Sequence, residues 1–168
     1  MSDGLRIRAG VEADAPLIAQ LIDELNADQG EETGHVTAAA VRRDGFGERP
    51  EFLVLLAELD GEPVGYALFH PTWSTEVGAR GYYLYDLYVR GSARGHGVGR
   101  ALMVALAHAA AADGRSFLWW NSKAWNTAAQ AFYGRLGAVE EAGKSHALDG
   151  DPLLALLREP DPRRRQPP

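Results

Sequence analysis

Cysteine is absent from the 168 residues of this chain, so disulfide bonds, cysteine metal sites and a thiol nucleophile are all excluded. No apolar run is long enough to span a bilayer, and residues 1–4 lack the pattern of a signal peptide. The 5 histidines show no spacing typical of metal ligands. We therefore expect a cytoplasmic protein that holds no metal ion and contacts no membrane.

Composition and charge are those of an ordinary globular chain. Hydrophobic residues make up 46% and charged residues 24%, and the length suits one domain with a substantial core. The formal net charge of −6 argues against nucleic acid as a partner and favours a cationic one. Residues 159–168 are rich in proline and arginine, which predicts a disordered tail after a domain of residues 1–158.

A loop rich in glycine and arginine, residues 89–100, is the most informative stretch of the sequence. Residues 82–89 before it favour a strand, and residues 101–112 after it show helical apolar spacing. A helix N-terminus presents unpaired N–H groups and partial positive charge to an anion. Arg94 can add a bidentate contact to phosphate. Three glycines let the backbone approach an anion closely: Gly95, Gly97 and Gly99.

This glycine-rich loop differs from the common nucleotide-binding loops. No Gly-Lys-Ser/Thr follows it, and no Gly-x-Gly-x-x-Gly fingerprint lies early in a βαβ unit. Taken alone, the glycines fit a strand-to-helix turn that binds nothing equally well.

Hydrophobic periodicity and turn residues predict the remaining strands and helices. Strands are expected at residues 5–8, 52–59, 64–70, 82–89 and 116–121. Helices are expected from Asp14 onward and at residues 37–43, 101–112 and 127–136. A loop at residues 71–81 carries Trp73, and residues 139–148 with 153–157 are predicted to form a closing hairpin.

The spacing Arg94-x-x-Gly97-x-Gly99 at a strand-to-helix junction resembles the acyl-CoA pyrophosphate loop of the GNAT superfamily of N-acetyltransferases. Residues 125–138 resemble that family's second cofactor motif, an asparagine followed by Phe-Tyr and Leu-Gly-Ala. The resemblance implies acetyl-CoA as the cofactor and an α/β (α+β) single-domain fold. Such a fold has a mixed, mostly antiparallel sheet of about 6–7 strands, about 4 helices, and a splayed parallel strand pair that admits CoA.

The resemblance also assigns residues to the cofactor. These are Leu87, Tyr88, Val89, Arg94, Gly95, His96, Gly97, Val98, Gly99, Arg100, Asn126 and Tyr133. In the family the amine attacks the thioester directly. A backbone N–H from a bulge in the fourth strand stabilises the thioester oxygen, and this bulge is expected here around Leu87, Tyr88 and Val89.

Tyr133 matches the family's tyrosine and is expected to stabilise the departing thiolate. A phenol of pKa ~10 facing a thiol of pKa ~8.5 makes full proton transfer uphill by roughly 2 kcal/mol, so Tyr133 acts first as a hydrogen-bond donor. The alternative for Tyr133 is a tyrosine that packs against a core face. For Asn126 the alternative is a plain helix N-cap, and both of its roles can hold.

Within the superfamily, the resemblance is closest to the spermidine/spermine (diamine) N-acetyltransferases, over most of residues 5–157. Tyr85 stands where that group has a glutamate implicated in proton removal, while the neighbouring aspartate is retained as Asp86. Period-two alternation places these two side chains on opposite faces unless a bulge intervenes, so Asp86 does not simply inherit the role. The group's Asp-Pro-Trp feature is reduced to residues 71–73, which weakens a polyamine assignment.

Proton removal can instead use water relayed by Tyr85 or by an acidic residue of the run 28–32, or His146 as a base. This acidic run is either a solvated loop or a rim that attracts an amine. The candidate catalytic residues are Tyr133, Tyr85 and Asp86. The candidate substrate-binding residues are Asp28, Glu31, Glu32, Trp73 and Tyr85.

The predicted function is transfer of an acetyl group from acetyl-CoA to a primary amine of a diamine, a polyamine or an amino acid with a side-chain amine. Antibiotic-like amines and protein amino groups are alternative acceptors. A third alternative is an acyl-CoA-binding module without catalysis, which Tyr85 favours and the retained Tyr133 opposes. Because family members are often homodimers, a homodimer is expected.

Overall fold

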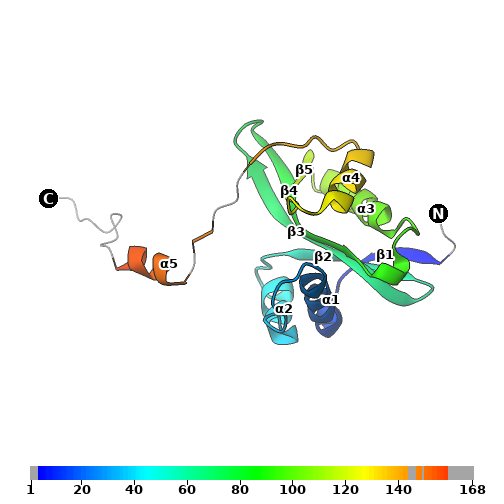
Figure 1. Cartoon of the computed structure of the whole chain (residues 1–168), viewed down its shortest axis with the longest axis horizontal. Coiled ribbons are helices and arrows are strands. Elements are labelled where there is room, and N and C mark those ends of the chain that lie inside the picture. The colour runs from blue at the N-terminus through cyan, green and yellow to red at the C-terminus, as the bar shows by residue number, and fades with distance from the viewer. Residues whose placement is uncertain (1–3, 144–146, 149, 159–168) are drawn as a thin grey trace. The chain divides into compact units, whose positions relative to one another are not determined.

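The computed structural model describes residues 4–143, 147–148 and 150–158 (Figure 1). The chain divides into two units, Met1–Ala129 and Gln130–Pro168. The predicted tail at residues 159–168 lies outside the described residues, so the domain boundary at residue 158 stays a prediction.

A five-stranded sheet forms the centre of the first unit, and its strands follow one another across the sheet in chain order. Neighbouring strands are antiparallel except β4 and β5, which are parallel. The strands are β1 (Leu5–Ala9), β2 (Leu53–Leu59), β3 (Glu62–Ser74), β4 (Ala79–Val89) and β5 (Phe117–Trp120). The mixed, mostly antiparallel sheet is confirmed, but it has five strands where six or seven were expected.

Helices cover both faces of this sheet (Figure 1). On one face lie α1 (Ala15–Asp28) and α2 (Ala38–Phe46), and on the other lies α3 (Val98–Ala112). Two short 3₁₀ segments, η1 (Glu12–Asp14) and η2 (Gly91–Ala93), precede α1 and α3. None of the described helices combines the length and the apolar composition needed to cross a membrane.

The core between the sheet and the first two helices is built from alternating strand positions. Leu56, Tyr66, Leu68 and Tyr88 point to this face, where they pack against apolar side chains of α1 and α2. The intervening residues face α3, which contacts every strand of the sheet. Residues 64–69 of β3 and most of residues 54–57 of β2 are therefore buried on both faces, whereas Trp73 and Tyr85 are exposed.

An ion pair fixes the second half of α1 beside the end of β4. The Arg90 guanidinium donates to both carboxylate oxygens of Glu24 at 2.8 Å and to the Pro63 carbonyl oxygen at 2.6 Å. The same guanidinium holds the pKa of Glu24 below its usual range. The carboxyl end of α1 is therefore held next to the glycine-rich loop that follows β4.

Helix α2 extends past the segment that was expected to end it. Thr37 caps its N-terminus by accepting a hydrogen bond from the Ala40 N–H at 3.1 Å, and the helix runs to Phe46. Gly45 lies beyond residue 43, where the helix was expected to end, but it is a buried helical residue. A Cβ there would lie 2.6 Å from the Phe52 ring, so this glycine serves close packing.

The segment predicted as a loop at residues 71–81 is mostly strand. β3 continues to Ser74 and β4 begins at Ala79, so a long hairpin replaces the loop. Trp73 lies on β3 opposite Arg80 and is 59% exposed. Antiparallel pairing satisfies the backbone N–H and C=O groups of these residues, although their sequence is typical of a loop.

The second unit contains the end of α4 (Thr127–Arg135), which begins in the first unit, and α5 (Gly150–Leu157). α4 ends at Arg135, one residue before the predicted end, and the following Gly137 has a left-handed φ of 86°, with the Ala138 N–H donating to the Tyr133 carbonyl oxygen at 3.2 Å. The predicted closing hairpin is wrong where it is described, because residues 150–157 are helical. A short apolar run fits either state, and a proline is tolerated in a first helical turn.

Candidate functional site

The centre of the candidate site is a bulge in β4. Leu68 of β3 pairs with Asp86, whereas the next residue, Phe69, pairs with Leu84. Tyr85 is therefore an extra residue between two paired positions, which is the definition of a β-bulge. A bulge shifts the alternation of side chains, so neighbours on either side of it can face the same way.

This bulge lies earlier in β4 than expected. Residues 87–89 pair regularly with Ala67, Tyr66 and Gly65. Gly65 lets the two backbones approach so closely that an added Cβ would collide with the Tyr88 carbonyl oxygen. This tight, regular pairing leaves no room for an extra residue, so the bulge predicted around Leu87, Tyr88 and Val89 lies at Tyr85 instead.

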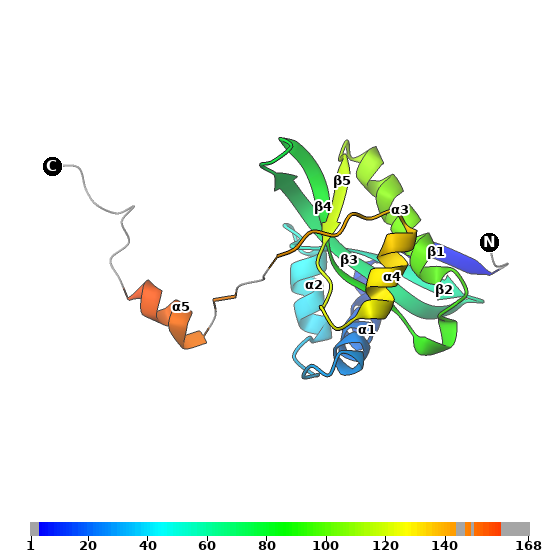
Figure 2. The same cartoon turned by 45° about the horizontal axis from the view of Figure 1, so that its top comes forward.

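β4 and β5 separate at Leu84, immediately before the bulge at Tyr85. Their parallel pairing covers four positions, from Gly81 with Phe117 to Leu84 with Trp120 (Figure 2). β5 ends there while β4 runs on to Val89. Among the described strands, residues 85–89 therefore have no partner on that side, and we call this stretch the open edge of β4. The splayed parallel pair expected from the sequence is confirmed.

A pocket of about 400 Å³ lies between α1, α2 and the sheet, and the bulge opens into it. Its lining residues are Ile22, His35, Val36, Ala40, Val41, Asp44, Phe52, Leu68, Tyr85 and Asp86. We call it the Asp86 pocket. Tyr85 and Asp86 were expected on opposite faces, and the bulge brings both to this pocket. The walls are largely apolar, and the carboxylates come from Asp44 and Asp86.

Asp86 is a half-buried carboxylate with a defined partner. The hydroxyl of Tyr66, which is completely buried on β3, donates a hydrogen bond to Asp86 Oδ2 at 3.0 Å. Burial raises the pKa of Asp86, and the hydrogen bond from Tyr66 opposes this by stabilising the ionised form. A carboxylate with a raised pKa is a stronger base than an exposed one, so Asp86 is suited to accept a proton.

Tyr85 is 60% exposed and belongs to a cluster of aromatic rings. Its ring centroid lies 4.8 Å from that of His70 and 5.1 Å from that of Tyr83. Tyr83 in turn contacts Trp119 of β5, with centroids 5.7 Å apart. This cluster provides an exposed aromatic surface next to Asp86, where a cation could be stabilised.

The glycine-rich loop has the geometry of an anion cradle. Gly95 and Gly97 have left-handed φ values of 84° and 81°, and an added Cβ at either position would meet open space. Gly97 is the N-cap of α3, and no side chain caps that helix. Val98, Gly99 and Arg100 therefore form the first turn, three residues earlier than predicted, and their N–H groups point out of the helix end. These features fit a diphosphate such as that of CoA.

Arg94 lies beside this loop and is held in place by two acceptors. Its Nε donates to the Val89 carbonyl oxygen at 2.9 Å, and its Nη2 donates to Asp28 Oδ2 at 2.6 Å. His96 Nδ1 lies 3.2 Å from the Arg94 carbonyl oxygen, within the same loop. Asp28 was predicted to bind substrate, but the structure pairs it with the arginine predicted to bind phosphate.

Asn126 and Tyr133 lie on either side of the unit boundary. Asn126 Oδ1 accepts a hydrogen bond from the Ala129 N–H at 3.1 Å, so the N-cap role is present. Tyr133 belongs to the second unit, where its ring packs against Phe132 with centroids 5.3 Å apart. The catalytic role of Tyr133 and the cofactor contact of Asn126 stay predictions.

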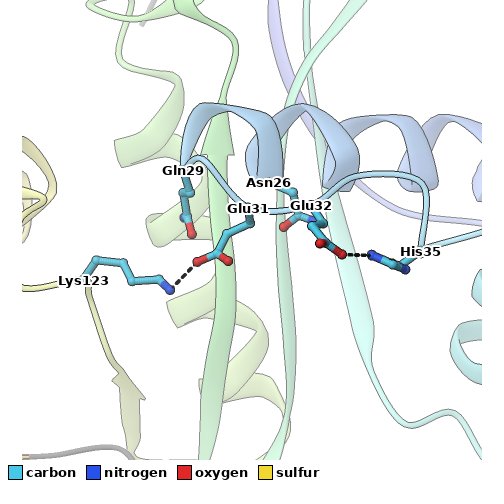
Figure 3. Close-up of a pocket in the computed structure, with 6 residues that line it drawn as sticks. All are labelled: Asn26, Gln29, Glu31, Glu32, His35 and Lys123. Carbon is cyan, nitrogen blue, oxygen red and sulfur yellow. Dashed lines mark hydrogen bonds and ion pairs between the residues drawn. The ribbon is translucent and has the colours of Figure 1, made fainter.

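A second hollow, of about 560 Å³, lies at the carboxyl end of α1 (Figure 3). Its lining residues are Asn26, Gln29, Glu31, Glu32, His35 and Lys123. We call it the mixed-charge pocket. Glu31 pairs with Lys123 Nζ at 2.7 Å, and Glu32 pairs with His35 Nε2 at 2.9 Å. The predicted acidic rim is therefore already engaged by cationic or polar partners, whereas Trp73 lines neither pocket.

The sequence did not predict the roles of Tyr66, which contacts Asp86, or of His35 and Lys123, which line the mixed-charge pocket. Tyr66 could have been found, because a tyrosine inside an apolar strand needs a partner for its hydroxyl. His35 and Lys123 carry no local pattern, since they come from a connection and from a segment after β5. Only the folded chain brings them together.

Comparison with known proteins agrees with this geometry. Residues 18–138 match the sequence family described as "Acetyltransferase (GNAT) family". The thialysine N-epsilon-acetyltransferase of Bos taurus is 37% identical over 143 residues, which cover 80% of this chain and 84% of that protein. The spermidine/spermine N(1)-acetyltransferase-like protein 1 of Homo sapiens is 31% identical over 82% of this chain and 21% of its own length.

The fold also matches a solved structure. An integron cassette protein from the mobile metagenome of V. cholerae superposes with a TM-score of 0.79, covering 94% of this chain and all of that one at 23% identity. Residues 18–138, which match the family, include the glycine-rich loop, the bulged strand and the splayed strand pair described above. The chain therefore belongs to the acetyltransferase (GNAT) family and is an N-acetyltransferase.

Proposed function

We propose that the protein transfers an acetyl group from acetyl-CoA to the primary amine of a small molecule, a diamine, a polyamine or an amino acid with a side-chain amine. The observation that carries this proposal is the bulge at Tyr85. It brings Asp86 into a largely apolar pocket near the point where β4 separates from β5. An amine in that pocket would meet a basic carboxylate beside the open edge of β4.

The Asp86 pocket suits a cation on a short aliphatic chain. Asp86 provides negative charge, and the exposed ring of Tyr85 provides an aromatic face, while the Asp44 carboxylate is paired with Arg43. The apolar walls, which include Phe52 and Leu68, suit methylene groups. A bulky, polar acceptor would make fewer apolar contacts with these walls than a short alkylamine would.

Each chemical step has a candidate residue. The ammonium group of the substrate, of pKa ~10, has to lose a proton before it can attack, and Asp86 accepts this proton. A backbone N–H of the open edge of β4 donates to the oxygen that gains negative charge. Acetyl-CoA, when bound, would supply the activated thioester carbon. Formation of the C–N bond would place negative charge on the oxygen, the C–S bond would then break, and the attacking nitrogen would release its second proton to solvent. Tyr133 donates a hydrogen bond, and finally a proton, to the sulfur that leaves.

Binding of acetyl-CoA is assigned to the glycine-rich loop and its neighbours. The first-turn N–H groups of α3 and the guanidinium of Arg94 would hold the diphosphate. Arg94 would exchange its contact with Asp28, which is exposed, for one with phosphate. In the absence of the ligand, the contact with Asp28 keeps the Arg94 side chain near the loop.

The test is thiol release from acetyl-CoA with a panel of diamines, polyamines and lysine-like amino acids. Asp86→Asn preserves the shape of the side chain and removes its basicity, so kcat should fall at least ~100-fold while CoA affinity stays unchanged. Glu76→Gln removes a carboxylate from the exposed turn of the same hairpin and serves as the matched control. Full activity of the Asp86 variant would disprove the assignment of the base.

A further inference from the structure

We infer that the mixed-charge pocket binds the α-amino and α-carboxylate groups of an amino-acid substrate, and that Lys123 selects such substrates over the corresponding diamines. This inference rests on the proposed function, since it takes the side-chain amine to react in the Asp86 pocket. It assigns a second subsite and a specificity-determining residue that lie outside the reacting centre.

The two pockets share one lining residue. His35 lines both the Asp86 pocket and the mixed-charge pocket, so the two lie side by side at this residue. Figure 3 shows Glu31 and Glu32 on the segment that follows α1, with Lys123 reaching toward Glu31 from the opposite side. A substrate that extends past His35 from Asp86 would therefore place its far end among these charged groups.

The set of charges in the second pocket matches a zwitterion. Glu31 and Glu32 are acceptors for an ammonium group, whereas Lys123 is a donor for a carboxylate. The amides of Asn26 and Gln29 can pair with either group. A diamine carries ammonium groups at both ends, so its far end gains nothing from Lys123 and is repelled by it. An amino acid offers a partner for both signs.

The ion pair between Lys123 and Glu31 is suited to exchange with such a substrate. Its N–O distance is 2.7 Å, and the two side chains are 49% and 52% exposed. Exposed pairs of this kind contribute little net stability, so separating them costs little. A bound head group would replace one ion pair by two, with its carboxylate at Lys123 and its ammonium at Glu31. The hydrogen bond from Lys123 also holds the pKa of Glu31 below its usual range.

The experiment compares amino acids with their decarboxylated counterparts. Acetylation of ornithine and putrescine, and of lysine and cadaverine, is measured for the parent protein and for Lys123→Met, which keeps the length of the side chain and removes its charge. Loss of a charge-assisted hydrogen bond predicts a rise in KM of about 10-fold or more for both amino acids. KM for both diamines should stay unchanged or fall, and Lys123→Arg should retain most of the preference.

Arg42→Gln is the matched control, because it removes one positive charge from an exposed position of α2 outside both pockets. It should leave all four KM values unchanged. Calorimetric titration of ornithine and putrescine in the presence of CoA provides a readout that does not depend on turnover. There the Lys123→Met change should weaken ornithine alone.

Three outcomes would overturn the inference alone, and a fourth would overturn it together with the proposed function. Equal changes for ornithine and putrescine would mean that Lys123 does not read the carboxylate. A higher KM for acetyl-CoA with unchanged amine preference would place Lys123 at the cofactor. A parent protein that acetylates diamines but never the amino acids would exclude the second subsite while leaving the proposed function intact. Absence of acetylation with every amine would instead refute the proposed function, and the inference with it.

Discussion

The hydrogen bond from Tyr66 to Asp86 gives a prediction about stability and activity together. Tyr66→Phe removes one hydroxyl from a completely buried ring and keeps the rest of the side chain, so packing is preserved. The change leaves Asp86 without the donor that lies 3.0 Å from Oδ2. Its effect should depend on whether Asp86 is ionised.

The magnitude follows from the charge on the acceptor. A hydrogen bond to an ionised group contributes about 1.5–3 kcal/mol, and one between neutral groups contributes about 0.5–1.5 kcal/mol. Because burial raises the pKa of Asp86, its contribution to folding stability is present at low pH and is lost as the pH rises through that pKa. Tyr66 offsets part of this loss. The free energy of unfolding of Tyr66→Phe should therefore fall further below that of the parent protein as the pH increases.

Urea unfolding followed by circular dichroism, from below the ordinary aspartate pKa of about 3.9 up to about pH 9, would measure this difference. Tyr82→Phe is the matched control, since the hydroxyl of Tyr82 donates to Asp113, an exposed carboxylate. For that variant, the decrease in the free energy of unfolding relative to the parent protein should be the same at every pH. An even loss in Tyr66→Phe as well would refute the reasoning about Asp86.

Activity provides the second half of the same test. If Asp86 is the base, removal of its donor raises its pKa further, and the acidic limb of kcat/KM should move to higher pH. The other titratable groups that line the pocket, His35, Asp44 and Tyr85, are the same in both proteins. An acidic limb that does not move would mean that another group accepts the proton.

Three further predictions concern the cofactor site and the packing of α2. Arg94→Ala should weaken CoA binding about 10-fold or more, measured by calorimetry, because it removes a charge-assisted contact to phosphate; unchanged affinity would exclude the diphosphate assignment. Tyr133→Phe should reduce kcat with little change in CoA affinity, and an equal loss of both would indicate a structural role. Gly45→Ala should lower the free energy of unfolding by about 1–3 kcal/mol, since the added Cβ would lie 2.6 Å from the Phe52 ring. The control Gly91→Ala meets nothing within 4 Å and should be almost neutral.

Local sequence patterns determined much of this protein. Strand alternation, helical apolar spacing and the glycines at 95, 97 and 99 predicted the strand, loop and helix order around the cofactor site. The end of α4 before Gly137 and the cap at Asn126 were predictable for the same reason. Each of these features depends on a few neighbouring residues whose backbone preferences are strong.

Tertiary structure decided the features that depend on contacts between distant segments. The bulge at Tyr85 follows from how β3 and β4 align, and it places Asp86 where simple alternation excluded it. The partners of Asp28, Glu31 and Glu32 come from three different parts of the chain, so an acidic run in the sequence became a set of ion pairs. In each case the local sequence permits several arrangements, and the energy of long-range pairing selects one of them.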